Sequence, residues 1–292
     1  MLLAKNGFGQ VHQVKLSQDL FALEIEHLAV KAKISLYGGQ VLSWQPNDEK
    51  EVFWLSKNAT FEQGKAIRGG IPLCWPWFGS HPNDSENKWG NHGFAREQIW
   101  QIDNIDILEQ GVEVILSWQG NNMNALWPHA CQLKQVLFFG RSFKQTLHMN
   151  NLSQSDAYYT GALHSYFTVS SPENVKVAAL EQASFYDKLA DQVFKPQPLE
   201  NVTGPVDRIY YTNDVMNIID EAWKRTIKLK SVNAEQWVFW NPGRDTANKM
   251  ADIHNNGEQE FFCLEAANTE MQLLSAGKWT TMSQEISIIN HE

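Results

Sequence analysis

Apolar and polar side chains alternate along much of this chain, and this two-residue period limits its fold more than any other feature. Successive side chains of a β-strand point to opposite faces, so the alternation predicts strands with one buried and one solvated face. Residues 28–36, Leu-Ala-Val-Lys-Ala-Lys-Ile-Ser-Leu, follow this pattern and stop before the turn signal Gly38-Gly39. Helical periodicity is scarce. We therefore expect an all-β fold of large antiparallel sheets with few short helices.

Two pairs of neighbouring segments are expected to form β-hairpins. Residues 98–108 pair with residues 112–118. Residues 132–139 pair with residues 142–149 and turn at Gly140. The remaining strands are predicted from alternation and from enrichment in β-branched and aromatic residues. They are expected at residues 41–44, 51–55, 158–169, 175–180, 208–211, 226–229, 237–240, 261–266 and 285–289.

One short helix and one long loop interrupt the strand pattern. The helix is expected at residues 245–253, with Asp245 as its N-cap. The polar segment 79–90 is expected to be a surface loop, because strand patterns continue on both sides of it. We therefore predict a single β-sandwich domain over residues 1–292 rather than two domains.

The charge balance restricts the partners of the protein. The chain has 24 Lys and Arg against 33 Asp and Glu, a formal net charge of −9. Such a protein repels nucleic acid and acidic membrane surfaces, so we expect neither as a partner. An anionic substrate would also be repelled unless arginines gather around its site. The 12 tryptophans suit stacking on sugar rings, although Trp also fills the space between packed sheets.

The cysteines and the N-terminal segment point to a reducing compartment. Cys74, Cys131 and Cys263 are far apart and odd in number, so they predict neither a disulfide framework nor a zinc site. The N-terminal residues lack the apolar core of a signal peptide, and no apolar run reaches transmembrane length. We expect a cytoplasmic protein, and the sequence gives no sign of an obligate protein partner.

Two titratable residues lie inside apolar, strand-like runs. His164 lies in Gly-Ala-Leu-His-Ser-Tyr-Phe, residues 161–167, and Glu265 lies in Phe-Phe-Cys-Leu-Glu-Ala-Ala-Asn, residues 261–268. A histidine can donate a proton near neutral pH, and burial raises the pKa of a carboxyl towards the range of a general base. The structural alternatives are a hydrogen-bonded core histidine and a glutamate paired with a core arginine. Both alternatives remain open at this point.

Two arginine-bearing loops indicate where an anion would bind. Arg68 precedes two glycines, where the backbone can approach a ligand, and Arg96 follows Asn-His-Gly-Phe-Ala at residues 91–95. The guanidinium fork suits phosphate or carboxylate oxygens, and the alternative is a loop-anchoring salt bridge. Asp207 could accept hydrogen bonds from sugar hydroxyls, but its local sequence favours turn capping. No nucleotide-binding glycine motif and no His-x-His or H-E-x-x-H pattern is present, so we expect no cofactor and no metal.

Six segments in order along the chain resemble the aldose 1-epimerase superfamily, and most closely its glucose-6-phosphate 1-epimerase branch. The first two are the most diagnostic of the branch that acts on sugar phosphates. The segments are Arg-Gly-Gly-Ile-Pro-Leu-Cys-Trp-Pro-Trp-Phe-Gly (68–79), Asn-His-Gly-Phe-Ala-Arg (91–96), Leu-His-Ser-Tyr-Phe (163–167), Asp-Arg-Ile-Tyr (207–210), Val-Phe-Trp-Asn-Pro (238–242) and Cys-Leu-Glu-Ala-Ala-Asn (263–268).

The resemblance implies a galactose-mutarotase-like β-supersandwich and an acid–base reaction without a cofactor. In this family a glutamate, matched by Glu265, removes the proton of the anomeric hydroxyl, and a histidine, matched by His164, protonates the ring oxygen. The ring opens, C1 rotates and reclosure inverts the anomer. The positions expected to contact the substrate are Arg68, Asn91, His92, Arg96 and Asp207.

The expected function is therefore the interconversion of the α and β anomers of a hexose 6-phosphate, with D-glucose 6-phosphate as the expected sugar. The alternative is a non-catalytic protein that binds or senses sugar phosphates on the same fold. A hydrolase or lyase is less favoured, because hydrolysis usually needs two carboxylates and one buried candidate is found. One departure from the family is Gly243-Arg244, where relatives often carry an aromatic residue and where we expect extra positive charge near the site.

Overall fold

The computed structural model describes residues 1–200 and 202–291, and antiparallel β-sheets dominate it. In this part of the chain the named strands form three sheets, and every pairing between named strands is antiparallel. The prediction of an all-β fold with large antiparallel sheets is therefore confirmed. The prediction of one domain over residues 1–292 stays a prediction.

The first sheet has five strands in chain order, each joined to the next by a short turn. Its strands are β1 (Leu2–Lys5), β2 (Gly9–Lys15), β3 (Phe21–His27), β4 (Val30–Ser35) and β5 (Val41–Pro46). The sequence pattern identified β4 and β5 but not β1 to β3. In β2 several positions of both faces are only half-buried, so the contrast between the faces is weak.

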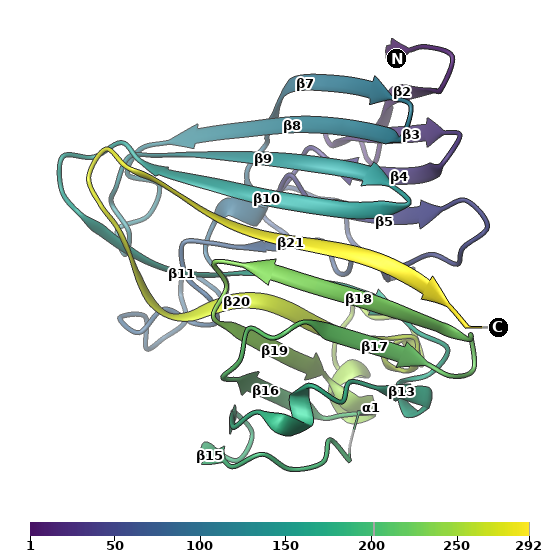
Figure 1. The fold of residues 1–292 in the computed structure, drawn as a ribbon. Helices are drawn as coiled ribbons and strands as arrows, with labels where there is room; N and C mark the ends of the chain where they lie inside the picture. Colours follow the sequence, from purple (N-terminus) through teal and green to yellow (C-terminus); the bar gives the residue numbers. More distant parts are fainter. Residues whose placement is uncertain (201, 292) are drawn as a thin grey trace.

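The second sheet has eight strands and contains both predicted hairpins, which are confirmed. The last strand of the chain inserts between strands from two earlier parts of the sequence, which no local pattern reveals (Figure 1). The order across the sheet is β13 (Val175–Lys176), β17 (Met216–Asp220), β18 (Arg225–Val232), β21 (Trp279–Asn290), β10 (Ser142–Asn151), β9 (Cys131–Gly140), β8 (Gly111–Gly120) and β7 (Gln101–Leu108).

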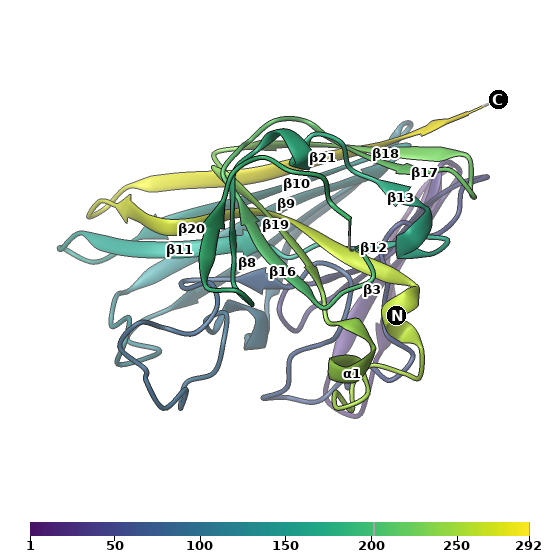
Figure 2. The same cartoon turned by 90° about the horizontal axis from the view of Figure 1, so that it is seen from below.

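The third sheet carries Asp207 and Glu265 in its strands and packs under the second (Figure 2). Its long central strand β20 continues into β21 of the second sheet through one turn, which connects the two layers. The order is β15 (Gln192–Phe194), β14 (Phe185–Asp187), β16 (Val206–Tyr210), β19 (Gln236–Asn241), β20 (Phe261–Leu274), β11 (Ala157–Leu163) and β6 (Leu73–Cys74), and β12 (Tyr166–Thr168) also pairs with β20.

The three sheets meet around the buried side chain of Phe53. Its ring centroid lies 5.9 Å from Trp44 of β5, 5.3 Å from Phe143 of β10 and 5.8 Å from Phe167 of β12. Aromatic rings at these separations contribute about 0.5–1.5 kcal/mol per pair beyond their burial. The predicted use of aromatic residues between packed sheets is confirmed at these positions.

Helical structure in the described residues is limited to single turns. The α-helix α1 (Gly243–Ala247) begins two residues before the start of the predicted helix and ends six residues before its predicted end. Pro242 rather than Asp245 occupies the N-cap. The 3₁₀ turns are η1 (Ala95–Glu97), η2 (Pro172–Asn174), η3 (Leu180–Gln182) and η4 (Gly257–Gln259). None of these described helices is long and apolar enough to cross a membrane.

Three predicted strands need correction. Residues 51–55 form only isolated bridges, because the Glu51 carboxylate accepts hydrogen bonds from the backbone N–H groups of Trp44, Val52 and Phe53 in place of a strand ladder. The strand expected at 175–180 ends after Lys176 and gives way to η3. The strand expected at 158–169 is broken between β11 and β12, and the break has a consequence for the site.

Candidate active site

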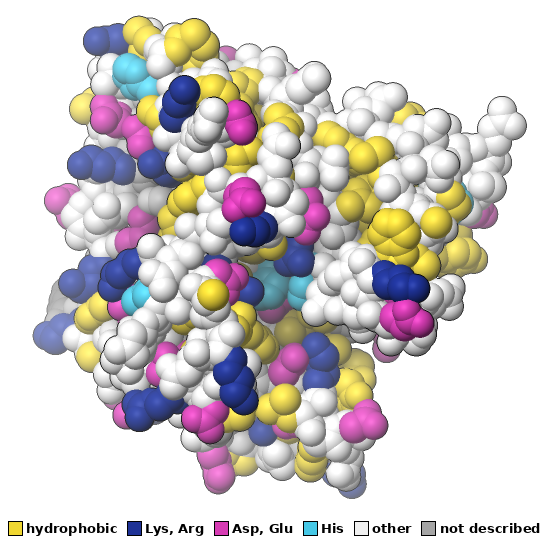
Figure 3. Space-filling model, turned by 180° about the vertical axis from the view of Figure 1, so that it is seen from behind, with side chains coloured by type: hydrophobic (Ala, Val, Ile, Leu, Met, Phe, Trp, Pro, Cys, Tyr) yellow, Lys and Arg dark blue, Asp and Glu magenta, His cyan; other side chains and the backbone are white. Residues whose placement is uncertain are grey.

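All seven residues expected to form the site line one cavity of about 390 Å³. They are Arg68, Asn91, His92, Arg96, His164, Asp207 and Glu265. Seen from behind, histidine and basic side chains gather in a hollow near the middle of the molecule (Figure 3). The wall also contains Tyr166, Lys188 and Trp240, which the sequence analysis did not name as site residues.

Glu265 lies on the face of β20 that forms part of the cavity wall. Phe261 and Cys263 pack in one apolar cluster and Leu264 in another, as the predicted alternation of faces requires. The Glu265 side chain is 1% exposed, and its Oε2 atom has no hydrogen-bond partner among the described residues. Among the described residues its one partner within ion-pair distance is His164, so the expected alternative of a core arginine partner is wrong.

His164 stands in the break between β11 and β12, and not inside a strand as predicted. Its backbone N–H donates to Pro72 O, outside the sheet. The next residue, Ser165, points to the core, where it bonds to Gln284, and Gln284 in turn donates to Gln145. Since these amides are buried and paired, they hold the break in place and fix the direction of the His164 ring.

The imidazole of His164 and the carboxylate of Glu265 form a coupled pair. His164 Nε2 lies 3.3 Å from Glu265 Oε1, and the His164 ring stacks on Tyr166 with centroids 4.9 Å apart. Burial, reinforced by the charge of Asp207, raises the pKa of Glu265 well above its usual value. Burial, reinforced by Arg68 and Arg96, lowers the pKa of His164 to about 3. These directions favour a pair that holds one proton between its two groups at neutral pH.

His92 presents a neutral imidazole to the same cavity. Its Nδ1 accepts a hydrogen bond from the backbone N–H of Gly79 at 3.1 Å, so the ring proton lies on Nε2. Burial and the nearby Arg96 hold the pKa of His92 well below its usual value. Its ring centroid lies 5.5 Å from that of His164. His92 can therefore donate a hydrogen bond to a ligand without carrying charge.

Arg68 is held in place by two partners on different segments. Its Nε donates to Asp252 Oδ2 at 3.0 Å, and its Nη1 donates to the hydroxyl of Tyr166 at 2.9 Å. The two glycines after Arg68 approach the backbone of neighbouring segments, and neither is among the residues that line the cavity. Both have positive φ, and a Cβ on Gly69 or Gly70 would collide with the backbone of the segments beside them.

Arg96 differs from the other cations of the cavity because it has no carboxylate partner among the described residues. Its Nη2 donates to the backbone carbonyl of Asn91 at 2.7 Å. Its Nε is buried and has no hydrogen-bond partner in the described part of the chain. A buried guanidinium N–H without a partner costs free energy, and an anion in the cavity would satisfy it.

Asp207 lies inside β16 and forms an ion pair with Lys188, Nζ to Oδ2 2.9 Å. Turn capping, the alternative that the local sequence favoured, is therefore wrong. Lys188 follows β14 on an exposed turn. No local sequence pattern distinguishes it from other surface lysines, so its place at the site could not be predicted. Lys188 and Asp207 both line the cavity, so this ion pair forms part of its wall.

Arg244 lies outside the cavity, which corrects the expectation that it adds positive charge near the site. Its side chain is 68% exposed, and its Nε lies 3.9 Å from Glu258 at a separate hollow. The residue before it, Gly243, has positive φ and packs against the backbone at Gly204 and Pro205. An aromatic side chain at position 243 would collide with this backbone.

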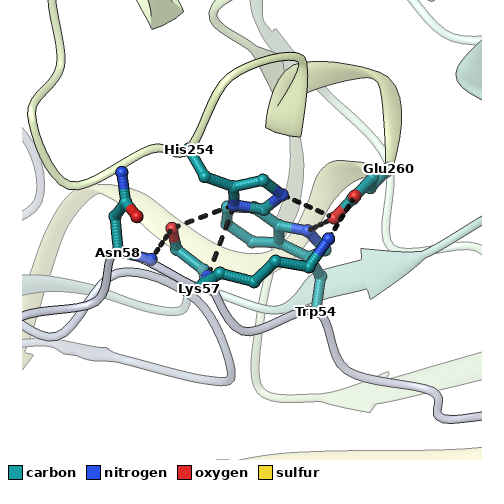
Figure 4. Close-up of polar contacts among 6 residues, drawn as sticks. Trp54, Lys57, Asn58, His254 and Glu260 are labelled. Carbon is teal, nitrogen blue, oxygen red and sulfur yellow. Dashed lines mark hydrogen bonds and ion pairs between the residues drawn. The ribbon is translucent and has the colours of Figure 1, made fainter.

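A second polar cluster supports the site from outside, formed by Trp54, Lys57, His254 and Glu260 (Figure 4). Glu260 accepts hydrogen bonds from Trp54 Nε1 and Lys57 Nζ, both at 2.9 Å, and its Oε2 lies 3.0 Å from His254 Nε2. These contacts tie the turn before η4 to the loop after Trp54. Because Asp252 belongs to that turn, the cluster also fixes the partner of Arg68.

One group of potential metal ligands occurs in the described residues. One donor atom from each of His164, Cys263 and Glu265 lies within 4.8 Å of the other two, and all three side chains are buried. The sequence shows no metal-binding motif here, because His164 is far along the chain from Cys263 and Glu265.

The sequence and the fold are similar to those of proteins described as sugar epimerases and mutarotases. The family profile described as aldose 1-epimerase matches residues 22–287. A Salmonella typhimurium protein named "Putative glucose-6-phosphate 1-epimerase" is 32% identical over 275 residues, which cover 92% of this chain and 91% of that protein. An Escherichia coli protein with the same name shows the same identity and coverage.

Solved structures agree with this assignment. A "putative mutarotase" of Salmonella typhimurium superimposes with a TM-score of 0.87 at 29% identity, covering 100% of this chain and 97% of that one. A galactose mutarotase-like protein of Clostridium acetobutylicum shares the fold, with a TM-score of 0.78 at 16% identity over 98% and 100% of the two chains. The expected galactose-mutarotase-like architecture is confirmed. The chain belongs to the aldose 1-epimerase family, whose members interconvert the anomers of sugars.

Proposed function

We propose that the protein interconverts the α and β anomers of a hexose 6-phosphate, with D-glucose 6-phosphate as the substrate. One observation carries the proposal. A buried pair of proton-transfer groups shares a single cavity with Arg96, whose Nε has no partner. The names of the relatives from Salmonella typhimurium and Escherichia coli support the choice of sugar.

In the proposed reaction Glu265 and His164 act on the two oxygens attached to C1. Glu265 takes the proton of the anomeric hydroxyl and His164 delivers a proton to the ring oxygen, which opens the ring. Rotation about C1–C2 and reclosure, with the two groups in exchanged roles, give the other anomer. Each positioned acid or base contributes roughly 10²–10⁴-fold to such a reaction. The proton that the pair holds supplies the acid for the first step.

The phosphate is proposed to bind at Arg96, with Arg68 and Lys188 beside it. Arg68 is already balanced by Asp252 and Lys188 by Asp207, whereas Arg96 has no carboxylate within ion-pair distance among the described residues. A phosphate near Arg96 would neutralise this charge and satisfy the buried Nε. The arginines also overcome the repulsion that a net charge of −9 exerts on an anion.

Phosphate binding is also proposed to set the protonation of the pair. Arg68 and Arg96 both lower the pKa of His164, so a bound dianion that neutralises them would raise it. The shared proton would then move towards His164 and leave Glu265 ionised, which is the arrangement that the reaction needs. In this proposal the phosphate increases the rate of the chemical step as well as the affinity.

Anomer exchange measured by NMR tests the proposal. With glucose 6-phosphate at equilibrium, the wild-type protein is expected to raise the exchange rate between the two C1 resonances far above the buffer rate. Glucose and other hexose 6-phosphates form the comparison panel, and glucose 1-phosphate, which has no free anomeric hydroxyl, is the control that cannot exchange. No acceleration with any phosphorylated hexose would reject the proposal.

A sugar-phosphate binding protein without activity is the alternative kept from the sequence. The Glu265→Gln variant separates the two functions, because it keeps the shape of the side chain and removes the base. The epimerase proposal requires loss of exchange with ligand binding retained. Unchanged behaviour in both measurements would favour the alternative.

A further inference from the structure

We propose that His164, Cys263 and Glu265 form a binding site for a thiophilic divalent cation such as Zn²⁺ or Cd²⁺, and that the bound ion blocks the acid–base pair. The binding step stands on the geometry of these three side chains alone. The predicted inhibition rests, in addition, on the proposed epimerase function.

The distances fit an ion with small adjustments of the side chains. Three atoms within 4.8 Å of one another have a common point no more than about 2.8 Å from each, the side of an equilateral triangle divided by √3. Bonds from Zn²⁺ to nitrogen, oxygen and sulfur are about 2.0–2.3 Å long. Each donor therefore needs to move by at most roughly 0.5–0.8 Å, which side-chain rotation can provide. Cys263 and Glu265 share one face of β20, and His164 faces them from the strand break.

The donors have capacity for an ion. Glu265 is 1% exposed, and its Oε2 has no partner in the described part of the chain. The 3.3 Å contact between His164 Nε2 and Glu265 Oε1 is longer than a strong hydrogen bond, and an ion between the two groups would replace the shared proton. Three protein ligands leave the fourth position of a tetrahedral ion for a water molecule.

Charge balance favours a divalent ion that accepts a thiolate. Binding releases the thiol proton of Cys263 and the proton of the His164–Glu265 pair, which leaves one thiolate, one carboxylate and a neutral imidazole around the ion. The complex is then neutral overall, so the nearby Arg68 and Arg96 do not oppose it strongly. A ligand set of sulfur, nitrogen and one oxygen favours Zn²⁺ or Cd²⁺ over Mg²⁺ or Ca²⁺.

The inhibition follows from the identity of the ligands. The lone pair of His164 Nε2 and the Glu265 carboxylate would both be coordinated, so neither could exchange a proton with a sugar. Because two protons leave on binding, affinity is expected to rise with pH over the range in which the thiol and the pair hold those protons. Removal of the ion by a chelator restores the pair and the activity.

Titration of the full chain with Cd²⁺ alone tests the binding step. The ultraviolet charge-transfer absorption of a cadmium–thiolate bond is expected to saturate at one ion per chain. Cys263→Ser should lose this absorption, whereas the double variant Cys74→Ser/Cys131→Ser, which keeps Cys263 as its single cysteine, should retain it. Isothermal titration calorimetry with Zn²⁺, and with Mg²⁺ as the control ion, gives an independent readout.

Each outcome decides the proposal. Absence of the absorption in the wild type, or its persistence in Cys263→Ser, overturns the site. If Cys263→Ser does not fold, Glu265→Gln replaces it, because the loss of one ligand should weaken Cd²⁺ binding by at least tenfold. Cd²⁺ binding by a protein with no epimerase activity would leave this site standing and reject the proposed function. An active epimerase that Cd²⁺ neither binds nor inhibits would reject the site alone.

Discussion

Replacement of Arg96 by alanine should separate phosphorylated from free sugars. Arg96 forms no ion pair within the described residues, and its one hydrogen bond goes to the backbone carbonyl of Asn91. The substitution therefore leaves no buried carboxylate without a partner. The expected loss of folding stability is about 1 kcal/mol, the typical contribution of one hydrogen bond.

The effect on the substrate should be larger. A hydrogen bond to a charged group contributes about 1.5–3 kcal/mol, and a factor of ten corresponds to about 1.4 kcal/mol. We therefore expect kcat/KM for glucose 6-phosphate to fall by roughly 10- to 150-fold in Arg96→Ala. The value for glucose should not fall, because glucose carries no group that needs this guanidinium, and it should rise because the variant lacks the Arg96 charge that lowers the pKa of His164. Inorganic phosphate, which competes with the substrate phosphate, should inhibit the exchange of glucose 6-phosphate more strongly in the wild type than in the variant.

Exchange NMR with both sugars at several concentrations gives the two values of kcat/KM after subtraction of the buffer rate. Arg96→Met is a matched variant that keeps the apolar stem of the side chain, and Arg244→Met is the control for loss of one positive charge outside the cavity. Equal loss for both sugars would refute the reasoning, since it would show that Arg96 maintains the structure of the site. A comparable effect in Arg244→Met would show that long-range charge, and not contact, is responsible.

Three further outcomes follow from the same geometry. Glu265→Gln should lower kcat by roughly 10²–10⁴-fold with a smaller change in KM, which exchange NMR measures. Because burial raises the pKa of Glu265 above 4.5 and lowers that of His164 from 6.5 to about 3, the native and the unfolded pair each hold one proton between about pH 4.5 and 6.5. The contribution of the pair to the free energy of unfolding should thus be constant in that window. It should decrease as the pH is lowered from 4.5 towards 3, and it should also decrease as the pH is raised above 6.5. Urea unfolding should show that the decrease above pH 6.5 is absent in Glu265→Gln. Inorganic phosphate at low concentration should accelerate the exchange of free glucose by the wild type, and no acceleration would contradict the proposed effect of phosphate on the proton of His164.

The sequence alone determined several strands in which one face is buried and the other wet. The hairpins β7–β8 and β9–β10 follow from alternation, because each step along a strand reverses the side-chain direction. The same rule placed Cys263 and Glu265 on one face. It failed at residues 51–55, where a side-chain carboxylate competes with the ladder for backbone N–H groups. It failed again at His164, where a buried amide network holds a break.

The tertiary structure decided which residues meet. The seven expected site residues extend from position 68 to position 265, and only the pairing of distant strands brings them into one cavity. Local sequence could not reveal that Asp252 balances Arg68, that Lys188 balances Asp207, or that Arg96 has no such partner. The physical reason is that side-chain period is a property of neighbouring residues. The charge, burial and proton affinity of a group instead depend on whatever the fold packs against it.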